Sequence, residues 1–137
     1  MASDGMAVAS GSALGRRVGN SAGFLNDLSG GGGALACVLN NCICYFNSAP
    51  AGLATNYDSS STLNYCCTTP LPASGIGNIM NNPLLVNRAA SNFQLQTNSP
   101  CINAGNNAYV NFPTDLAGNP RIVGGTVDMG AYEYQTP

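Results

Sequence analysis

Short apolar runs alternate with polar turn residues along most of this chain. From residue 76 onward the runs are separated by Asn, Gly, Pro and Ser, and they are Ile76–Met80, Leu84–Val86, Phe93–Leu95 and Ile122–Val127. Runs of this length are too short for helices and are typical of β-strands bounded by turns. The pattern therefore predicts an all-β fold.

An internal repeat indicates how these strands are arranged. The segment Leu39–Cys42, Leu-Asn-Asn-Cys, recurs 24 residues later as Leu-Asn-Tyr-Cys over Leu63–Cys66. A fixed period between 20 and 50 residues is typical of stacked structural units. We therefore predict about four coils of a parallel β-solenoid, a stack of roughly 20 Å at ~4.8 Å per strand. Asn40 and Asn64 would then hydrogen-bond to each other along the stack.

Strand alternation predicts which side chains share a face. Within residues 42–46, Cys42, Cys44 and Phe46 are expected on one face of the strand. Ile43 and Tyr45 are expected on the other face. Cys42 would stack on Cys66 inside the solenoid, where a cysteine packs as a small apolar side chain.

From Gly33 onward the chain resembles the C-terminal region of bacterial surface proteins related to polymorphic outer-membrane proteins. The matching segments are Leu39–Cys42, Tyr65–Pro70, Asn98–Gly105, Asp115–Arg121 and Val127–Tyr134. The resemblance implies a right-handed parallel β-helix, secreted or exposed at the cell surface, with a C-terminal cap over residues 115–134. The family turn usually reads Asp-Leu-Asp-Gly-Asn-Pro-Arg, and Ala117 replaces its second Asp here, which puts a cation site at this turn in doubt.

The chain divides into a leader, residues 1–33, and the β-helix coils with their cap, residues 34–137. The leader does not match the family, and Arg16–Arg17 follow its small residues rather than preceding an apolar segment, unlike a signal peptide. Family members have more coils, so one end of this short stack is expected to be open. The leader is expected either to be disordered or to fold over that open end. Alternatively, a second copy of the chain would pair there in a homo-oligomer.

Composition excludes two classes of partner. Charged residues make up 7% of the chain, Lys is absent and the net charge is −2, so no basic surface is available for nucleic acid. No apolar stretch approaches the ~20 residues that a membrane span requires. Binding sites tend to lie on the loops of a rigid solenoid, and the partner that we expect there is a polysaccharide.

The cysteines predict disulfides or core packing rather than a metal site. The six candidates permit 15 pairings, and they are Cys37, Cys42, Cys44, Cys66, Cys67 and Cys101. The chain has no His, and the spacing of these cysteines differs from that of structural zinc sites. We predict no metal and no cofactor.

The absence of His and Lys removes the common nucleophilic mechanisms. One acidic cluster remains, Asp115, Asp128 and Glu133, which with Arg121 would supply the paired carboxylates of a glycoside hydrolase or polysaccharide lyase. The competing interpretation is structural. Asp115 opens a turn and can bond the backbone two residues on, while Arg121 pairs with Asp115 or Asp128 beneath the cap.

Three further residues are candidate ligand contacts. Tyr57 and Asp58 lie in a polar loop between the two matched repeats, and Arg88 follows an apolar run at a coil edge. The sequence therefore predicts a structural, adhesin-like or carbohydrate-contacting solenoid segment. The alternative function is a carbohydrate-active enzyme that uses the clustered carboxylates.

Overall fold

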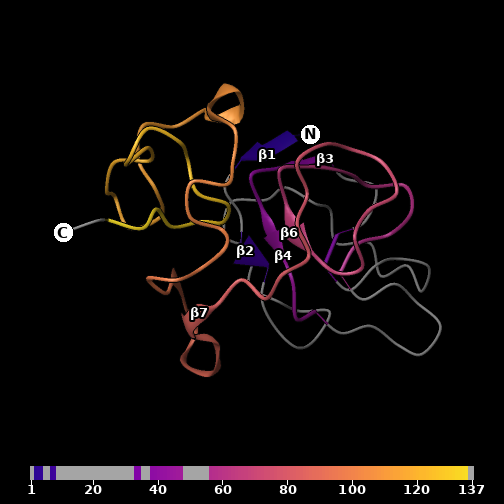
Figure 1. Cartoon of the computed structure of the whole chain (residues 1–137), viewed down its shortest axis with the longest axis horizontal. Coiled ribbons are helices and arrows are strands. Elements are labelled where there is room, and N and C mark those ends of the chain that lie inside the picture. The colour runs from indigo at the N-terminus through magenta and orange to yellow at the C-terminus, as the bar shows by residue number, and fades with distance from the viewer. Residues whose placement is uncertain (1, 5–6, 9–32, 35–37, 48–55, 136–137) are drawn as a thin grey trace.

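The computed structural model describes residues 2–4, 7–8, 33–34, 38–47 and 56–135. Strands are the main regular elements in this part of the chain, and its only helices are two short 3₁₀ turns. The elements in chain order are β1 (Ala2–Asp4), β2 (Ala7–Val8), β3 (Val38–Asn40), β4 (Ile43–Cys44), β5 (Thr62–Asn64), β6 (Cys67–Thr68), β7 (Leu85–Asn87), η1 (Arg88–Ala90), β8 (Asn92–Leu95) and η2 (Asn107–Tyr109). The all-β prediction is confirmed (Figure 1).

Two parallel sheets stand side by side and follow the predicted repeat. One has the order β1-β3-β5 and the other β2-β4-β6. Leu39 pairs with Leu63 and Asn40 with Asn64, so the register equals the 24-residue offset of the sequence. The Asn64 side chain donates to Oδ1 of Asn40 at 3.1 Å, which confirms the predicted Asn contact along the stack.

The repeated corner between the two sheets has a specific backbone conformation. Asn41 joins β3 to β4 with φ of +52°, and Tyr65 joins β5 to β6 with φ of +51°. Positive φ is uncommon for residues with a side chain, although Asn adopts it more readily than most. The same bend at equivalent positions turns each strand pair into the second sheet.

The leader adds a strand to each sheet. β1 pairs in parallel with β3, and β2 pairs in parallel with β4. The backbone of the leader thus covers the edges that β3 and β4 would otherwise expose. Most of the leader, residues 9–32, lies outside the described residues, as does Cys37.

After β6 the parallel stacking stops, which differs from the four predicted coils. Ile79 adds a single parallel bridge beyond Cys67. The next two apolar runs, residues 84–86 and 93–95, form the antiparallel pair β7–β8, and residues 122–127 form no strand. The prediction that these runs stack as coils was wrong, because a turn of only a few residues between β7 and β8 joins antiparallel neighbours.

Two apolar clusters lie on opposite faces of the β4–β6 sheet. The inner cluster lies between the two parallel sheets and comprises Ala34, Leu39, Cys42, Cys44, Leu63 and Cys66. The outer cluster joins the sheet to the C-terminal part of the chain and comprises Ile43, Cys67, Leu85, Leu95, Cys101 and Met129. Cys42 does pack with Cys66 as predicted. Phe46 was placed wrongly, because its φ of +60° breaks the alternation and it packs against the outer cluster.

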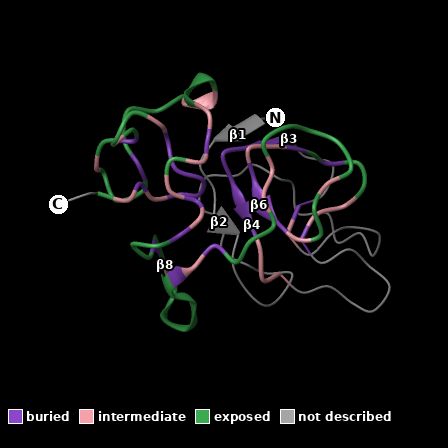
Figure 2. Ribbon diagram, viewed as in Figure 1, coloured by how far each residue is buried: buried purple, intermediate pink, exposed green. Residues whose placement is uncertain are grey.

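The C-terminal segment, residues 96–135, therefore packs against the side of the stack (Figures 1 and 2). The sequence predicted a cap over one end instead. Side chains of a strand point away from the sheet plane, so Ile43 and Cys67 present a lateral apolar surface rather than an end. This surface is what the segment covers.

Candidate functional site

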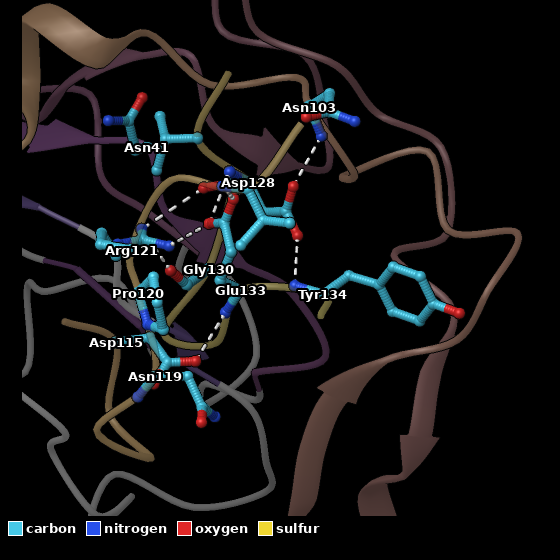
Figure 3. A network of polar contacts seen from close by, with 12 residues as sticks. Asn41, Asn103, Asp115, Asn119, Pro120, Arg121, Asp128, Gly130, Glu133 and Tyr134 are labelled. Atoms are coloured by element: carbon cyan, nitrogen blue, oxygen red, sulfur yellow. Dashed lines mark hydrogen bonds and ion pairs between the residues drawn. The ribbon is translucent and has the colours of Figure 1, made fainter. Parts of the chain in front are cut away.

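The C-terminal segment contains a buried network of three carboxylates and one arginine (Figure 3). Asp115, Arg121, Asp128 and Glu133 are all buried, and Asp128 is only 1% exposed. The sequence analysis predicted these four residues as a candidate catalytic cluster. The structure does bring them together, so their hydrogen bonds decide what they can do.

Asp115 organises the turn that follows it. Its Oδ1 accepts from the backbone N–H groups of Ala117 and Asn119, both at 2.9 Å. Its Oδ2 accepts from the N–H of Glu133 at 3.0 Å. The predicted bond to the backbone two residues on is thus present, and both carboxylate oxygens are occupied by main-chain donors.

Asp128 connects two segments that are distant in sequence. Its Oδ1 accepts from the N–H of Asn103 at 2.7 Å, and its Oδ2 accepts from the N–H of Tyr134 at 2.6 Å. Burial is the main cause that raises the pKa of this carboxyl, while the two N–H donors and nearby Arg121 act in the opposite direction.

Glu133 is the ion-pair partner of Arg121. Its Oε2 lies 3.1 Å from Nη1 of Arg121 and also accepts from the N–H of Asp128 at 3.0 Å. Its Oε1 accepts from the N–H of Val123 at 3.0 Å. Burial raises the pKa of Glu133 as well. The sequence had predicted Asp115 or Asp128 as the partner of Arg121. The ion pair is with Glu133 instead, and Nη2 of Arg121 donates to the backbone carbonyl of Asp128 at 3.3 Å.

These contacts describe a scaffold for a segment without regular strands. The three carboxylates together accept seven backbone N–H bonds, three at Asp115 and two each at Asp128 and Glu133. A buried N–H without a partner is costly, and sheets normally supply the acceptors. Here the side chains replace a sheet ladder. A glycosidase acid or base must instead reach its substrate, and these oxygens face main-chain donors within the protein.

Asn41 fastens this segment to the parallel sheets, and sequence reasoning missed it. Its side chain donates to the carbonyl of Asn106 at 3.0 Å and accepts from the N–H of the same residue at 2.7 Å. Its own carbonyl accepts from the N–H of Gly130 at 2.8 Å. The available signal was the repeat itself, in which Asn41 is equivalent to Tyr65 and so departs from the pattern.

In the polar loop between the repeats, the two predicted contact residues form hydrogen bonds with other groups of the protein. The Tyr57 hydroxyl donates to the carbonyl of Pro70 at 3.0 Å. The Asp58 carboxylate accepts from the backbone N–H of Ser60 and from the hydroxyls of Ser60 and Ser61. These bonds stabilise a turn and do not bring the two residues to the other candidate contact, Arg88.

Arg88 lies in a surface pocket of about 300 Å³. The pocket is lined by Phe46, Asn82, Leu84, Leu85, Arg88 and Gln96. The guanidinium carbon of Arg88 lies 4.4 Å from the centroid of the Phe46 ring, which holds the cation in place. Among the described residues no carboxylate forms an ion pair with Arg88. Of the predicted ligand contacts, this one borders a cavity.

Two amide side chains complete the polar lining of the pocket. Oδ1 of Asn82 accepts from the N–H of Leu84 at 3.0 Å, so its amide N–H groups remain to donate. Nε2 of Gln96 donates to the carbonyl of Leu85 at 2.8 Å, so its oxygen remains to accept. The pocket lining thus offers a cation, a donor and an acceptor together with apolar side chains.

The chain matches no family model, no curated protein and no solved structure. Among the described residues, none of the helices has the length and hydropathy to cross a bilayer. Within the same residues, His, Cys, Asp and Glu side chains form no group of three that could hold a metal ion.

Proposed function

We propose that this chain is a segment of a secreted or cell-surface right-handed parallel β-helix that contacts acidic carbohydrate through the pocket at Arg88. The β-helix part of the proposal is supported by the two in-register parallel sheets and by the Asn40–Asn64 contact along the stack. The right hand follows from the rule for parallel crossover connections.

The observation that carries the ligand proposal is the arrangement around Arg88. A uronic acid presents a carboxylate beside hydroxyl groups that both donate and accept. An arginine binds a carboxylate with two parallel N–H donors, and Asn82 and Gln96 offer the complementary groups for hydroxyls. The pocket is open to the surface, and its volume of about 300 Å³ is at the lower end of the range for small-molecule sites, which suits one sugar unit of a polymer.

The carboxylate network argues for a binding segment rather than an enzyme. The acidic side chains proposed for glycoside cleavage are buried and hydrogen-bonded to main-chain N–H groups. The pocket lining contains no acidic residue. The proposed role of the pocket is therefore recognition.

The test is binding to polygalacturonate, with dextran as the neutral polymer, measured by calorimetry. Arg88→Gln should weaken binding to polygalacturonate by tenfold to a hundredfold, the value of a charge-assisted hydrogen bond of ~1.5–3 kcal/mol. Arg88→Lys should recover only part of this loss, because an ammonium lacks the planar pair of donors.

The matched control is Ala73→Glu, which changes the net charge by the same amount at an exposed position outside the pocket. This variant should bind like the wild type. Equal affinity of wild type and Arg88→Gln for polygalacturonate would refute the role of the pocket. Equal binding to dextran would refute the preference for an acidic polymer.

A further inference from the structure

Two adjacent cysteines of the second repeat point to opposite faces of their sheet. Cys66 belongs to the inner cluster together with Cys42. Cys67, the first residue of β6, belongs to the outer cluster together with Cys101. The alternation of the strand thus gives each member of the pair a different neighbouring cysteine.

The backbone fixes Cys67 and Cys101 on the two sides of the outer cluster. The N–H of Cys67 donates to the carbonyl of Cys42 at 2.8 Å within the parallel sheet. The N–H of Cys101 donates to Oγ of Ser99 at 3.2 Å, and its carbonyl accepts from the N–H of Met129 at 3.0 Å. Both cysteines are fully buried, so their neighbours are set by packing.

The Cys67 thiol donates to the carbonyl of Asn81 at 3.1 Å, and its sulfur packs in the same buried cluster as Cys101. Its interaction with Cys101 is the largest cause that raises the pKa of the Cys67 thiol, and burial is the next. The other described cysteines have different surroundings. Cys66 contacts Cys42, and the Cys44 thiol donates to the carbonyl of Asn56 at 2.7 Å.

We propose that Cys67 and Cys101 form a disulfide when the chain folds in an oxidising compartment, and that the structure describes its reduced form. The oxidant is a low-molecular-weight disulfide such as glutathione disulfide. The thiolate of one cysteine attacks this disulfide and releases one glutathione. The second thiolate attacks the mixed disulfide and releases the other. The two cysteines lose two protons and two electrons, one S–S bond forms in the protein, and the oxidant is reduced to two thiols.

This bond would join the parallel sheets to the C-terminal segment. The linked residues are 34 positions apart (101 − 67), and the loop between them contains the β7–β8 pair. Cross-linking over such a distance restricts the unfolded chain and so stabilises the folded one. Burial of both sulfur atoms protects the bond, because a reductant must first reach it.

The distribution of arginine provides a direct assay. Trypsin cleaves after Lys and Arg, and this chain has only Arg16, Arg17, Arg88 and Arg121. Peptide 18–88 then contains five cysteines, whereas peptide 89–121 contains Cys101 alone. The full chain is refolded with glutathione and glutathione disulfide, alkylated in denaturant and digested without reduction. The expected product has the mass of the two peptides joined, less two hydrogens, plus one alkyl group for each cysteine of peptide 18–88 that remained a free thiol. Alkylated Cys101 in an unjoined peptide 89–121 would overturn the proposal.

The adjacent residues Cys66 and Cys67 provide matched variants that identify which cysteine is bonded to Cys101. Cys67→Ala should abolish the joined product, whereas Cys66→Ala should retain it. Electron-transfer fragmentation of the wild-type product between residues 66 and 67 makes the same assignment without a variant, should Cys67→Ala not fold. A link that maps to Cys66 or to any other cysteine would contradict the pairing. Reduction of the wild type should also lower its Tm by about 10 °C, and reduction of Cys67→Ala should not. Polysaccharide binding is not part of either readout, so this proposal and the proposed function can fail separately.

Discussion

The Arg121–Glu133 ion pair allows a sharp test of the carboxylate scaffold. Glu133→Ala removes the partner of a buried guanidinium, and the side chains of the pair are 5% and 0% exposed. Loss of one member of a buried pair typically costs ~3–5 kcal/mol, because the other charge remains buried. The N–H groups of Val123 and Asp128 also lose their acceptor, at ~1–3 kcal/mol each. We therefore expect Glu133→Ala to lower the free energy of unfolding by at least ~4 kcal/mol.

Arg121→Met should lower the free energy of unfolding by less than Glu133→Ala does. Glu133 then keeps its two main-chain donors and can take up a proton, whereas an arginine cannot lose its charge. The Nη2 contacts of Arg121 with the carbonyls of Asp128 and Gly130 are lost, at 3.3 and 2.8 Å. The variant that combines Arg121→Met with Glu133→Ala leaves no unpaired charge in the interior. Its loss of unfolding free energy should therefore be smaller than the sum of the two single losses by ~2 kcal/mol or more.

Urea unfolding followed by tyrosine fluorescence measures all three variants, since the chain has six Tyr and no Trp. The reasoning about charge would be refuted by single costs that add without coupling. A cost of less than ~1 kcal/mol for Glu133→Ala would refute the scaffold itself. Asp58→Asn serves as the control, because its turn lies in the loop between the repeats and should shift stability by no more than ~1 kcal/mol.

Three further predictions concern stability. Gly130→Ala should lower the free energy of unfolding by ~2–4 kcal/mol, because residue 130 has a φ of +107° and a Cβ there would lie 2.8 Å from Cδ1 of Ile43. Its control is Gly118→Ala, which should lower it by only ~1 kcal/mol in the same urea assay, because residue 118 has a φ of +85° but no atom within 4 Å of the added Cβ. Asn41→Ala should cost ~2–4 kcal/mol, since both backbone groups of Asn106 lose a partner, and amide hydrogen exchange at residue 106 should accelerate. Burial raises the folded-state pKa of two carboxyls in the network, so the folded chain binds more protons than the unfolded one between their ordinary and raised pKa values. Their contribution to unfolding free energy should therefore rise as pH falls from 7 toward 4, and the Asp128→Asn, Glu133→Gln double variant should lack it; an unchanged pH profile in that variant would contradict this.

The repeat could be predicted from sequence because it is a regular, local pattern. Leu39 and Leu63 pair in register, and Cys42 packs with Cys66, as their 24-residue spacing indicated. The end of the repeat could not be found in the same way. A short apolar run such as residues 84–86 suits a stacked strand and a hairpin strand equally. The deciding features are the side chain of Asn87, which accepts from the N–H of Ala90, and Ser91 with φ of +58°.

The candidate site was predicted in its members but not in its contacts. The sequence grouped Asp115, Arg121, Asp128 and Glu133, and the structure brings them together. The sequence could not indicate that these carboxylate oxygens would accept hydrogen bonds from main-chain N–H groups. That role arises because the C-terminal segment forms few backbone–backbone hydrogen bonds of its own. Arg88 was a predicted contact, but Phe46, its aromatic neighbour, was assigned to the inner face. The positive φ of Phe46 was not apparent from strand alternation.

The lateral attachment of the C-terminal segment has a consequence for how such a protein can change in length. The segment rests on the outer face of β4 and β6 and is anchored at Asn41, so among the described side chains its contacts involve two rungs of the stack. Rungs inserted between β2 and β3 would lengthen the stack and leave this seat unaltered. Duplication of the second repeat would instead place a new outer face beneath the segment. These contacts favour growth of the stack at its β2–β3 side, and we expect natural size variation to fall in residues that precede β3.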